Sequence, residues 1–126
     1  MQNPLHVLLV DDHVDFLETV SFWMKSKGYV VSVANNAEEA LQAVKTEAVD
    51  IVFLDMHMPK TNGVQTLSQI RTIKKDLPVI LVTAYLEDAL IDQAREFGIS
   101  GLFPKEGSFD KLLSVIEVAL RTHRRP

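Results

Sequence analysis

The sequence predicts one α/β domain built on an open, doubly wound parallel sheet with helices on both faces. Short β-branched and apolar runs alternate five times with longer stretches whose apolar residues recur at helical spacing, the pattern of repeated βα units. The chain has 126 residues, enough for one compact core and too few for two ordinary domains. Because crossovers between parallel strands are right-handed, five such units leave few other topologies.

Five strands are expected where β-branched and apolar residues cluster. They are residues 6–10, 29–34, 49–55, 78–84 and 100–103. The middle of the fourth run is entirely apolar, which indicates burial on both faces of the sheet. The fifth run is the shortest and gives the weakest signal.

A helix is expected after each strand, and turn or capping residues mark the ends. The expected apolar stripes lie in residues 16–24, 40–44, 64–73, 87–97 and 109–121. Gly28 and Gly98 are placed to end helices in the left-handed conformation. Asn36 followed by Glu39 resembles a capping box, and Ser108 can cap the last helix.

Composition is typical of a soluble globular protein. Apolar residues make up 47%, charged residues 24%, and the formal net charge is -4, which excludes a disordered chain and an obvious binder of polyanions. The absence of cysteine excludes disulfides and thiolate sites. The first apolar run is too short for a signal peptide or a membrane span. We therefore expect a cytoplasmic protein without membrane contact and a single domain over residues 1–126, with residues 121–126 a basic tail or the start of a linker.

Polar side chains stand at the carboxyl ends of four strands, where doubly wound sheets bind ligands. They are Asp11 with Asp12, Asp55, Thr83 and Lys105. Three carboxylates on one rim repel one another and need a cation or a retained proton. With no cysteine and no clustered histidine, the oxygen donors suit a hard ion, Mg²⁺ or alternatively Mn²⁺. A nucleophilic carboxylate, a metal and donors for anionic oxygens together indicate phosphoryl chemistry at Asp55.

Each of these residues alone also has an ordinary structural role. An aspartate can cap a helix or form an Asx-turn, a threonine is common in strands, and a surface lysine is solvated. Their joint occurrence at the strand ends of one sheet favours a site. His57, two residues after Asp55, is interpreted as a side chain on the rim, because no second histidine or cysteine stands near it to complete a metal site.

These residues resemble the receiver domains of two-component response regulators over essentially the whole chain. The matching motifs are "LLVDDH", "FLDMHMPKTNG" for the pattern D-x-x-M-P-x-x-x-G, "VTA", and the lysine that follows "GISGLFP". The resemblance implies the flavodoxin-like strand order 2-1-3-4-5. It also implies a phosphoacceptor switch in which Asp55 receives a phosphoryl group from a sensor histidine kinase or a phosphotransfer protein.

The resemblance further implies a role for each site residue. Asp12, Asp55 and the backbone carbonyl of His57 would hold Mg²⁺, with Asp11 acting through water. Thr83 and Lys105 would bind the phosphoryl oxygens. The signal would leave through the face formed by the fourth helix, fifth strand and fifth helix, toward an output domain or effector. The domain itself is expected neither to be an enzyme nor to bind nucleic acid directly.

Two positions depart from the family pattern. Glu106 follows Lys105 where the family commonly has a cis proline, so a trans peptide is expected there. Leu102 occupies the place of an aromatic residue three positions before the lysine. The segments "DDH" and "KEGS" look more like receivers that precede a helix-turn-helix output domain.

Three other functions fit parts of the sequence. A Mg²⁺-dependent phosphohydrolase of the haloacid-dehalogenase type also uses an aspartate at a strand end, but it needs a second acid two residues on, where this chain has His57. A nucleotide-binding domain needs a glycine-rich phosphate loop, and none follows any strand. A nucleic-acid binder would use Arg121, Arg124 and Arg125, which are more typical of a solvated tail or linker.

Overall fold

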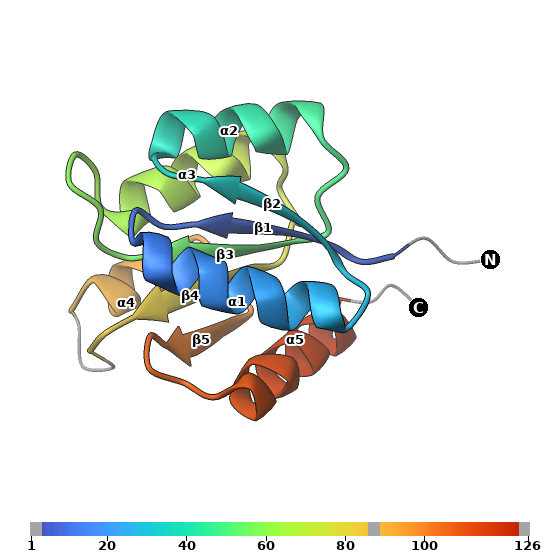
Figure 1. The fold of residues 1–126 in the computed structure, drawn as a ribbon. Coiled ribbons are helices and arrows are strands. Elements are labelled where there is room, and N and C mark those ends of the chain that lie inside the picture. The colour runs from blue at the N-terminus through green and yellow to red at the C-terminus, as the bar shows by residue number, and fades with distance from the viewer. Residues whose placement is uncertain (1–3, 86–88, 124–126) are drawn as a thin grey trace.

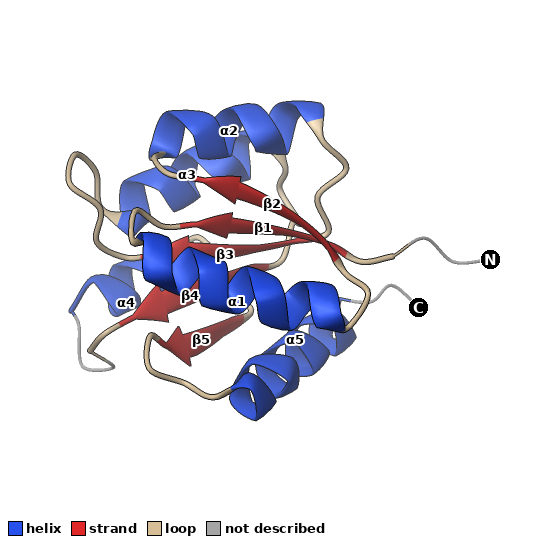
Figure 2. Cartoon of the chain, in the orientation of Figure 1, coloured by secondary structure: helices blue, strands red, loops and turns tan. Residues whose placement is uncertain are grey.

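The computed structural model describes residues 4–85 and 89–123. Its centre is a sheet of five parallel strands in the order β2-β1-β3-β4-β5, which confirms the predicted flavodoxin-like topology. The strands are β1 (His6–Val10), β2 (Val30–Ala34), β3 (Ile51–Asp55), β4 (Val79–Thr83) and β5 (Gly101–Pro104). All five arrows point the same way, so their carboxyl ends share one edge (Figure 2).

Helices cover both faces of the sheet (Figure 1). On one face lie α1 (Val14–Ser26) and α5 (Phe109–His123), and on the other lie α2 (Ala37–Thr46), α3 (Gly63–Ile73) and α4 (Ala89–Arg95). No helix in the described part of the chain combines the length and apolar character that a membrane span requires.

The strands divide the apolar side chains into two cores because successive residues of a strand point to opposite faces. Phe53 and Phe103 enter the core under α1 and α5, with their rings edge to face and centroids 6.3 Å apart. Leu54 and Leu81 enter the core under α2, α3 and α4. Every residue of β3 and β4 is buried, as expected for the central strands of a sheet covered on both sides.

The helix ends follow the sequence signals, with one addition. Gly28 and Gly98 have φ of 86° and 83°, the left-handed conformation that ends a helix. The Asn36 side chain caps α2 by accepting from the N–H of Glu39, although the Glu39 carboxylate accepts from Asn35 and not from Asn36. The complete capping box lies at α3, where Asn62 and Gln65 exchange bonds, and the sequence analysis did not identify it.

Element boundaries differ slightly from the expected ones. β2 and β3 start one and two residues later, and β5 extends through Pro104, which pairs with Thr83. Ser108 caps α5 as predicted, accepting from the N–H of Lys111. The expected fourth helix begins at residue 87, and residues 87 and 88 lie outside the described residues. The bond between Lys105 and Glu106 is trans, as predicted.

Arg71 joins two helix ends that sequence patterns do not connect. Its guanidinium donates to the carbonyls of Phe97 and Gly98 beyond α4, each at 2.7 Å. It also donates to the carbonyl of Leu77 ahead of β4, at 2.7 Å. Because carbonyls at helix ends otherwise lack partners, one half-buried side chain fixes the end of α4 against the α3–β4 connection.

We predict that Arg71→Lys lowers the free energy of unfolding by about 2 kcal/mol, since an ammonium cannot replace the guanidinium fork at three separate carbonyls. Urea unfolding measures the change. The matched control is Arg95→Lys on the exposed side of α4, where we expect a change within about 0.5 kcal/mol. Equal effects of the two substitutions would show that Arg71 acts only as a surface charge.

Candidate functional site

Strand geometry brings three of the predicted residues together. Asp11, Asp55 and Lys105 continue the alternation of β1, β3 and β5 on the side that faces α1 and α5. The backbone of two of them is fixed by the sheet, because the Asp11 N–H donates to Ala34 at 3.1 Å and the Lys105 N–H donates to Thr83 at 2.8 Å. The side chains of Asp11 and Lys105 therefore extend from fixed backbone positions at the carboxyl edge of the sheet.

The Lys105 ammonium lies between the two buried carboxylates. Its Nζ is 2.8 Å from Oδ2 and 3.1 Å from Oδ1 of Asp11, and 3.3 Å from Oδ2 of Asp55. The Phe16 ring, on α1, lies under the ammonium with its centroid 5.2 Å away. One positive charge thus serves two negative ones, and its place is set by α1 as well as by the sheet.

Asp55 is held in an unfavourable place for a charge. Its residue surface is 3% exposed, and one oxygen accepts a 3.3 Å hydrogen bond from the N–H of His57, so an Asx-type contact is present as well. Burial raises the pKa of the Asp55 carboxyl and the Asp11 carboxylate raises it further, while Lys105 and the His57 N–H act in the opposite direction. The raised pKa means that nearby positive charge does not fully compensate the ionised form.

Asp12 opens this cluster to solvent. Its side chain is 31% exposed and lines a groove of about 610 Å³, together with Asn36, Met58 and Lys60. The buried Oδ2 of Asp11 is paired with the Lys105 ammonium at 2.8 Å, whereas Oδ1 of Asp12 is buried and accepts no hydrogen bond within the described residues. The ligand atoms of Asp11, Asp12, Asp55 and His13 lie within 4.8 Å of one another. Three clustered carboxylates that share the Lys105 ammonium still carry excess negative charge, which suits a divalent cation such as Mg²⁺.

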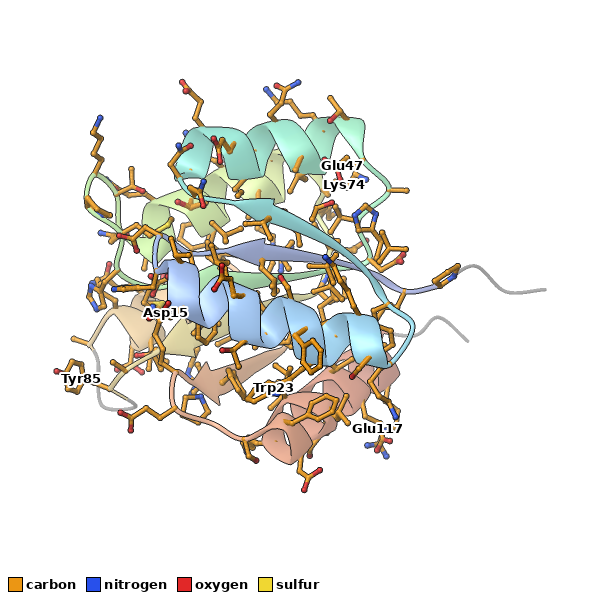
Figure 3. All side chains as sticks on the ribbon, viewed as in Figure 1. Asp15, Trp23, Glu47, Lys74, Tyr85 and Glu117 are labelled. Carbon is orange, nitrogen blue, oxygen red and sulfur yellow. The ribbon has the colours of Figure 1, made fainter. Side chains whose placement is uncertain are left out.

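Thr83 is buried at the end of β4, but its hydroxyl is not directed to the carboxylates. Thr83 Oγ1 donates to the carbonyl of Tyr85 at 2.9 Å and accepts from the Tyr85 N–H at 3.0 Å. The Tyr85 side chain itself is 72% exposed and points away from the body of the protein (Figure 3). The Thr83 hydroxyl is therefore hydrogen-bonded to the backbone of the β4–α4 connection.

The turn after Asp55 is closed by a glycine for a steric reason. Gly63 donates to the carbonyl of Met56 at 2.7 Å. A Cβ atom on Gly63 would lie 2.9 Å from the Met56 Cα, closer than real Cβ contacts come, and 3.1 Å from the Asp55 carbonyl oxygen, closer than most of them. The backbone that carries Asp55 is thus packed directly against the start of α3.

His13 is a member of the cluster that the sequence analysis missed. Its Nδ1 lies 2.9 Å from Oδ1 of Asp11 and 2.8 Å from Nζ of Lys105. His13, rather than Asp11 or Asp12, is the N-cap residue of α1, and its side chain makes no capping bond. The expectation that no histidine joins the carboxylates was wrong. The available signal was its position directly after Asp12.

Comparisons with known proteins agree with this geometry. The family model described as response regulator receiver domain matches residues 7–117. The chain is 37% identical over 120 residues to a transcriptional regulatory protein CpxR homolog of Haemophilus influenzae, covering 95% of this chain and 52% of that protein. It is 32% identical to the transcriptional regulatory protein ZraR of Klebsiella oxytoca, covering 94% of this chain and 27% of that protein.

Solved structures show the same fold. A CheY-like receiver domain protein of Methanospirillum hungatei superposes with a TM-score of 0.90 at 22% identity, covering 96% of this chain and 97% of that one. A two-component response regulator of the LuxR family from Aurantimonas superposes with a TM-score of 0.86 at 27% identity, covering 97% of this chain and 89% of that one. The chain spans about half or a quarter of the length of the two curated relatives.

We predict that Asp55→Asn raises the free energy of unfolding at neutral pH, by an amount of order 1 kcal/mol, when EDTA is present. A carboxyl whose pKa is raised in the folded state binds its proton more tightly there than in the unfolded chain. The wild type therefore loses stability as the pH rises from the ordinary aspartate pKa through the raised one, and the Asn variant does not.

Urea unfolding at several pH values measures this difference. The advantage of the Asn variant should vanish in acid, below the ordinary aspartate pKa, and Mg²⁺ should stabilise the wild type alone. An Asn variant that is less stable than the wild type at neutral pH would show that the pairing with Lys105 outweighs the cost of burial.

Proposed function

This chain belongs to the response regulator receiver family, and on that premise we propose that Asp55 is the residue that accepts the phosphoryl group. The observation that carries the proposal is the buried Asp55 carboxylate at the end of β3, which faces Lys105 at 3.3 Å and lies among further acids. The donor would be a sensor histidine kinase or a phosphotransfer protein. An Asp55 oxygen would form the new bond to phosphorus while the bond from phosphorus to the donor's imidazole nitrogen breaks.

The surroundings of Asp55 suit this transfer. Desolvation keeps the carboxylate free of competing water and raises its basicity, which favours attack on phosphorus. Lys105 is placed to leave Asp11 and pair with an oxygen of the incoming phosphoryl group, since its Nζ already contacts the Asp55 oxygen. Transfer also gives Lys105 a partner of greater negative charge than the carboxylate it leaves.

The acidic cluster provides for a divalent cation, Mg²⁺ or Mn²⁺. Asp12, Asp55 and the backbone carbonyl of His57 would bind it, with Asp11 acting through water. When bound, the cation supplies positive charge that screens the acids from an incoming phosphoryl group. The support is the cluster of three carboxylates around the Lys105 ammonium, together with the buried Oδ1 of Asp12, which accepts no hydrogen bond within the described residues.

Thr83 would report the modification by changing partners. Its hydroxyl bonds only the Tyr85 backbone among the contacts described for it, and it would exchange these bonds for one to a phosphoryl oxygen. That exchange releases the carbonyl and N–H of Tyr85 and loosens the entry to α4. The face formed by α4, β5 and α5 would then transmit the change to an output domain or effector. Because the curated relatives are transcriptional regulators of greater length, we propose an output that controls transcription.

We predict that acetyl phosphate with Mg²⁺ adds one phosphoryl group to the wild type and none to Asp55→Asn, because the amide is not a nucleophile at this position. Intact mass spectrometry measures the adduct, and EDTA should abolish it. The control is Asp50→Asn at the other end of β3, an exposed acid that should leave labelling unchanged. An equal adduct on the Asp55→Asn variant would refute the assignment. Turnover of acetyl phosphate without any adduct would favour a phosphohydrolase.

We predict that beryllofluoride, a mimic of the phosphoryl group, shifts amide signals mainly at residues 83–87 and 105–108, of which 86 and 87 lie outside the described residues. The Leu102 signal should change little. Leucine has no phenol that could hold the side chain in the solvent, and its inward and outward rotamers differ less in burial than those of an aromatic residue. Backbone NMR of the free and bound protein measures both. Large shifts at Leu102 with small ones around Thr83 would show that the switch follows another path.

A further inference from the structure

We propose that His13 supplies a nitrogen ligand to the cation site, so that this protein favours transition-metal ions such as Mn²⁺ and Co²⁺ over Mg²⁺ more strongly than carboxylates alone would. The inference rests on the cation site of the proposed function and adds a residue to it. Imidazole is a ligand for first-row transition metals, whereas Mg²⁺ strongly prefers oxygen. One nitrogen in an otherwise oxygen site therefore changes which ions bind best.

The distances match neighbouring positions around one ion. His13 Nδ1 is 3.4 Å from Oδ1 of Asp12, the neighbouring ligand, and 2.9 Å from Oδ1 of Asp11, which would contact the ion through water. Adjacent corners of an octahedral site with bonds near 2.1 Å are about 3.0 Å apart. The most distant ligand atoms of the cluster are within 4.8 Å, against about 4.2 Å for opposite corners, so a closure of about half an ångström suffices.

Nδ1 of His13 faces groups of opposite charge, at 2.9 Å from Oδ1 of Asp11 and 2.8 Å from Nζ of Lys105. One ring nitrogen offers either a hydrogen or a lone pair, so it cannot suit both contacts at once. A metal ion bound among these atoms attracts Nδ1 and the oxygens of Asp11 and Asp12 at once. It also frees Lys105 for the phosphoryl group.

The position of His13 leaves it free for this role. Its side chain is 62% exposed, and as the N-cap residue of α1 it makes no capping bond that ligation would break. The buried Oδ1 of Asp12, 3.4 Å from Nδ1 of His13, accepts no hydrogen bond within the described residues, and it independently marks a place that a cation can fill. A hydrogen-bonding role for His13 alone would leave that oxygen as it is.

The test is pulsed electron paramagnetic resonance of bound Mn²⁺, which detects ¹⁴N nuclei in the ligand shell. We expect ¹⁴N modulation in the wild type and in His6→Gln, whose histidine lies at the opposite end of β1, and none in His13→Gln. Calorimetry should show that His13→Gln weakens the affinity for Co²⁺ at least about tenfold, because the loss of a partner outside the ligand shell already costs that much. The affinity for Mg²⁺ should change by less than about twofold.

The outcomes separate this inference from the proposed function. Absence of ¹⁴N modulation in the wild type, or modulation that persists in His13→Gln, overturns the role of His13. Either result leaves the proposed function intact as long as Asp55 is labelled by acetyl phosphate. Failure of that labelling refutes the proposed function instead, whatever the nitrogen signal shows. Because Mn²⁺ is measured on the wild type itself, the first result does not depend on the folding of any variant.

Discussion

The carboxyl edge of the sheet depends on one constraint: its carboxylates repel one another, and the backbone does not allow them to separate. Asp11 and Asp55 are almost fully buried, and hydrogen bonds of the sheet hold the backbone at Asp11 and at Lys105. One ammonium cannot neutralise them and Asp12 as well. The site therefore carries excess negative charge, which is compatible with a bound divalent cation. The crowded charges lower the stability of the folded protein, and the same crowding makes the site reactive.

The two-residue period of a strand decides which residues share that charge problem. Asp11, Asp55 and Lys105 follow core residues of the α1/α5 side, whereas Thr83 follows Val79 and Leu81 on the other side. This explains why Lys105 contacts both aspartates while the Thr83 hydroxyl bonds the Tyr85 backbone. Convergence at one edge of a sheet thus gives proximity, but the alternation decides which side chains touch.

The fold was predictable because its signals are repeated and local: five alternating runs, glycines after helices and a capping asparagine. The acids at the strand ends were predictable as a group, since parallel strands end at one edge. Contacts that join distant segments could not be predicted from the sequence. The Arg71 bonds to Phe97 and Gly98, and the approach of His13 to Lys105, depend on where separate elements pack. His13 could not be assigned to the acids from the sequence, because a histidine at a helix N-terminus can face solvent or the sheet edge, and the packing of α1 decides which.

The same alternation limits the routes by which a change at Asp55 can reach the other face of the sheet. Asp55 and Lys105 lie on the α1/α5 side, while Thr83 and Leu102 belong to the side covered by α2, α3 and α4. The two sides are tied at the end of β4, where the Thr83 carbonyl accepts from the Lys105 N–H and its hydroxyl bonds Tyr85. A movement of the Lys105 backbone would therefore reach Thr83 through this hydrogen bond and the β4–α4 connection through the Thr83 hydroxyl, which gives the proposed switch a route between the two sides.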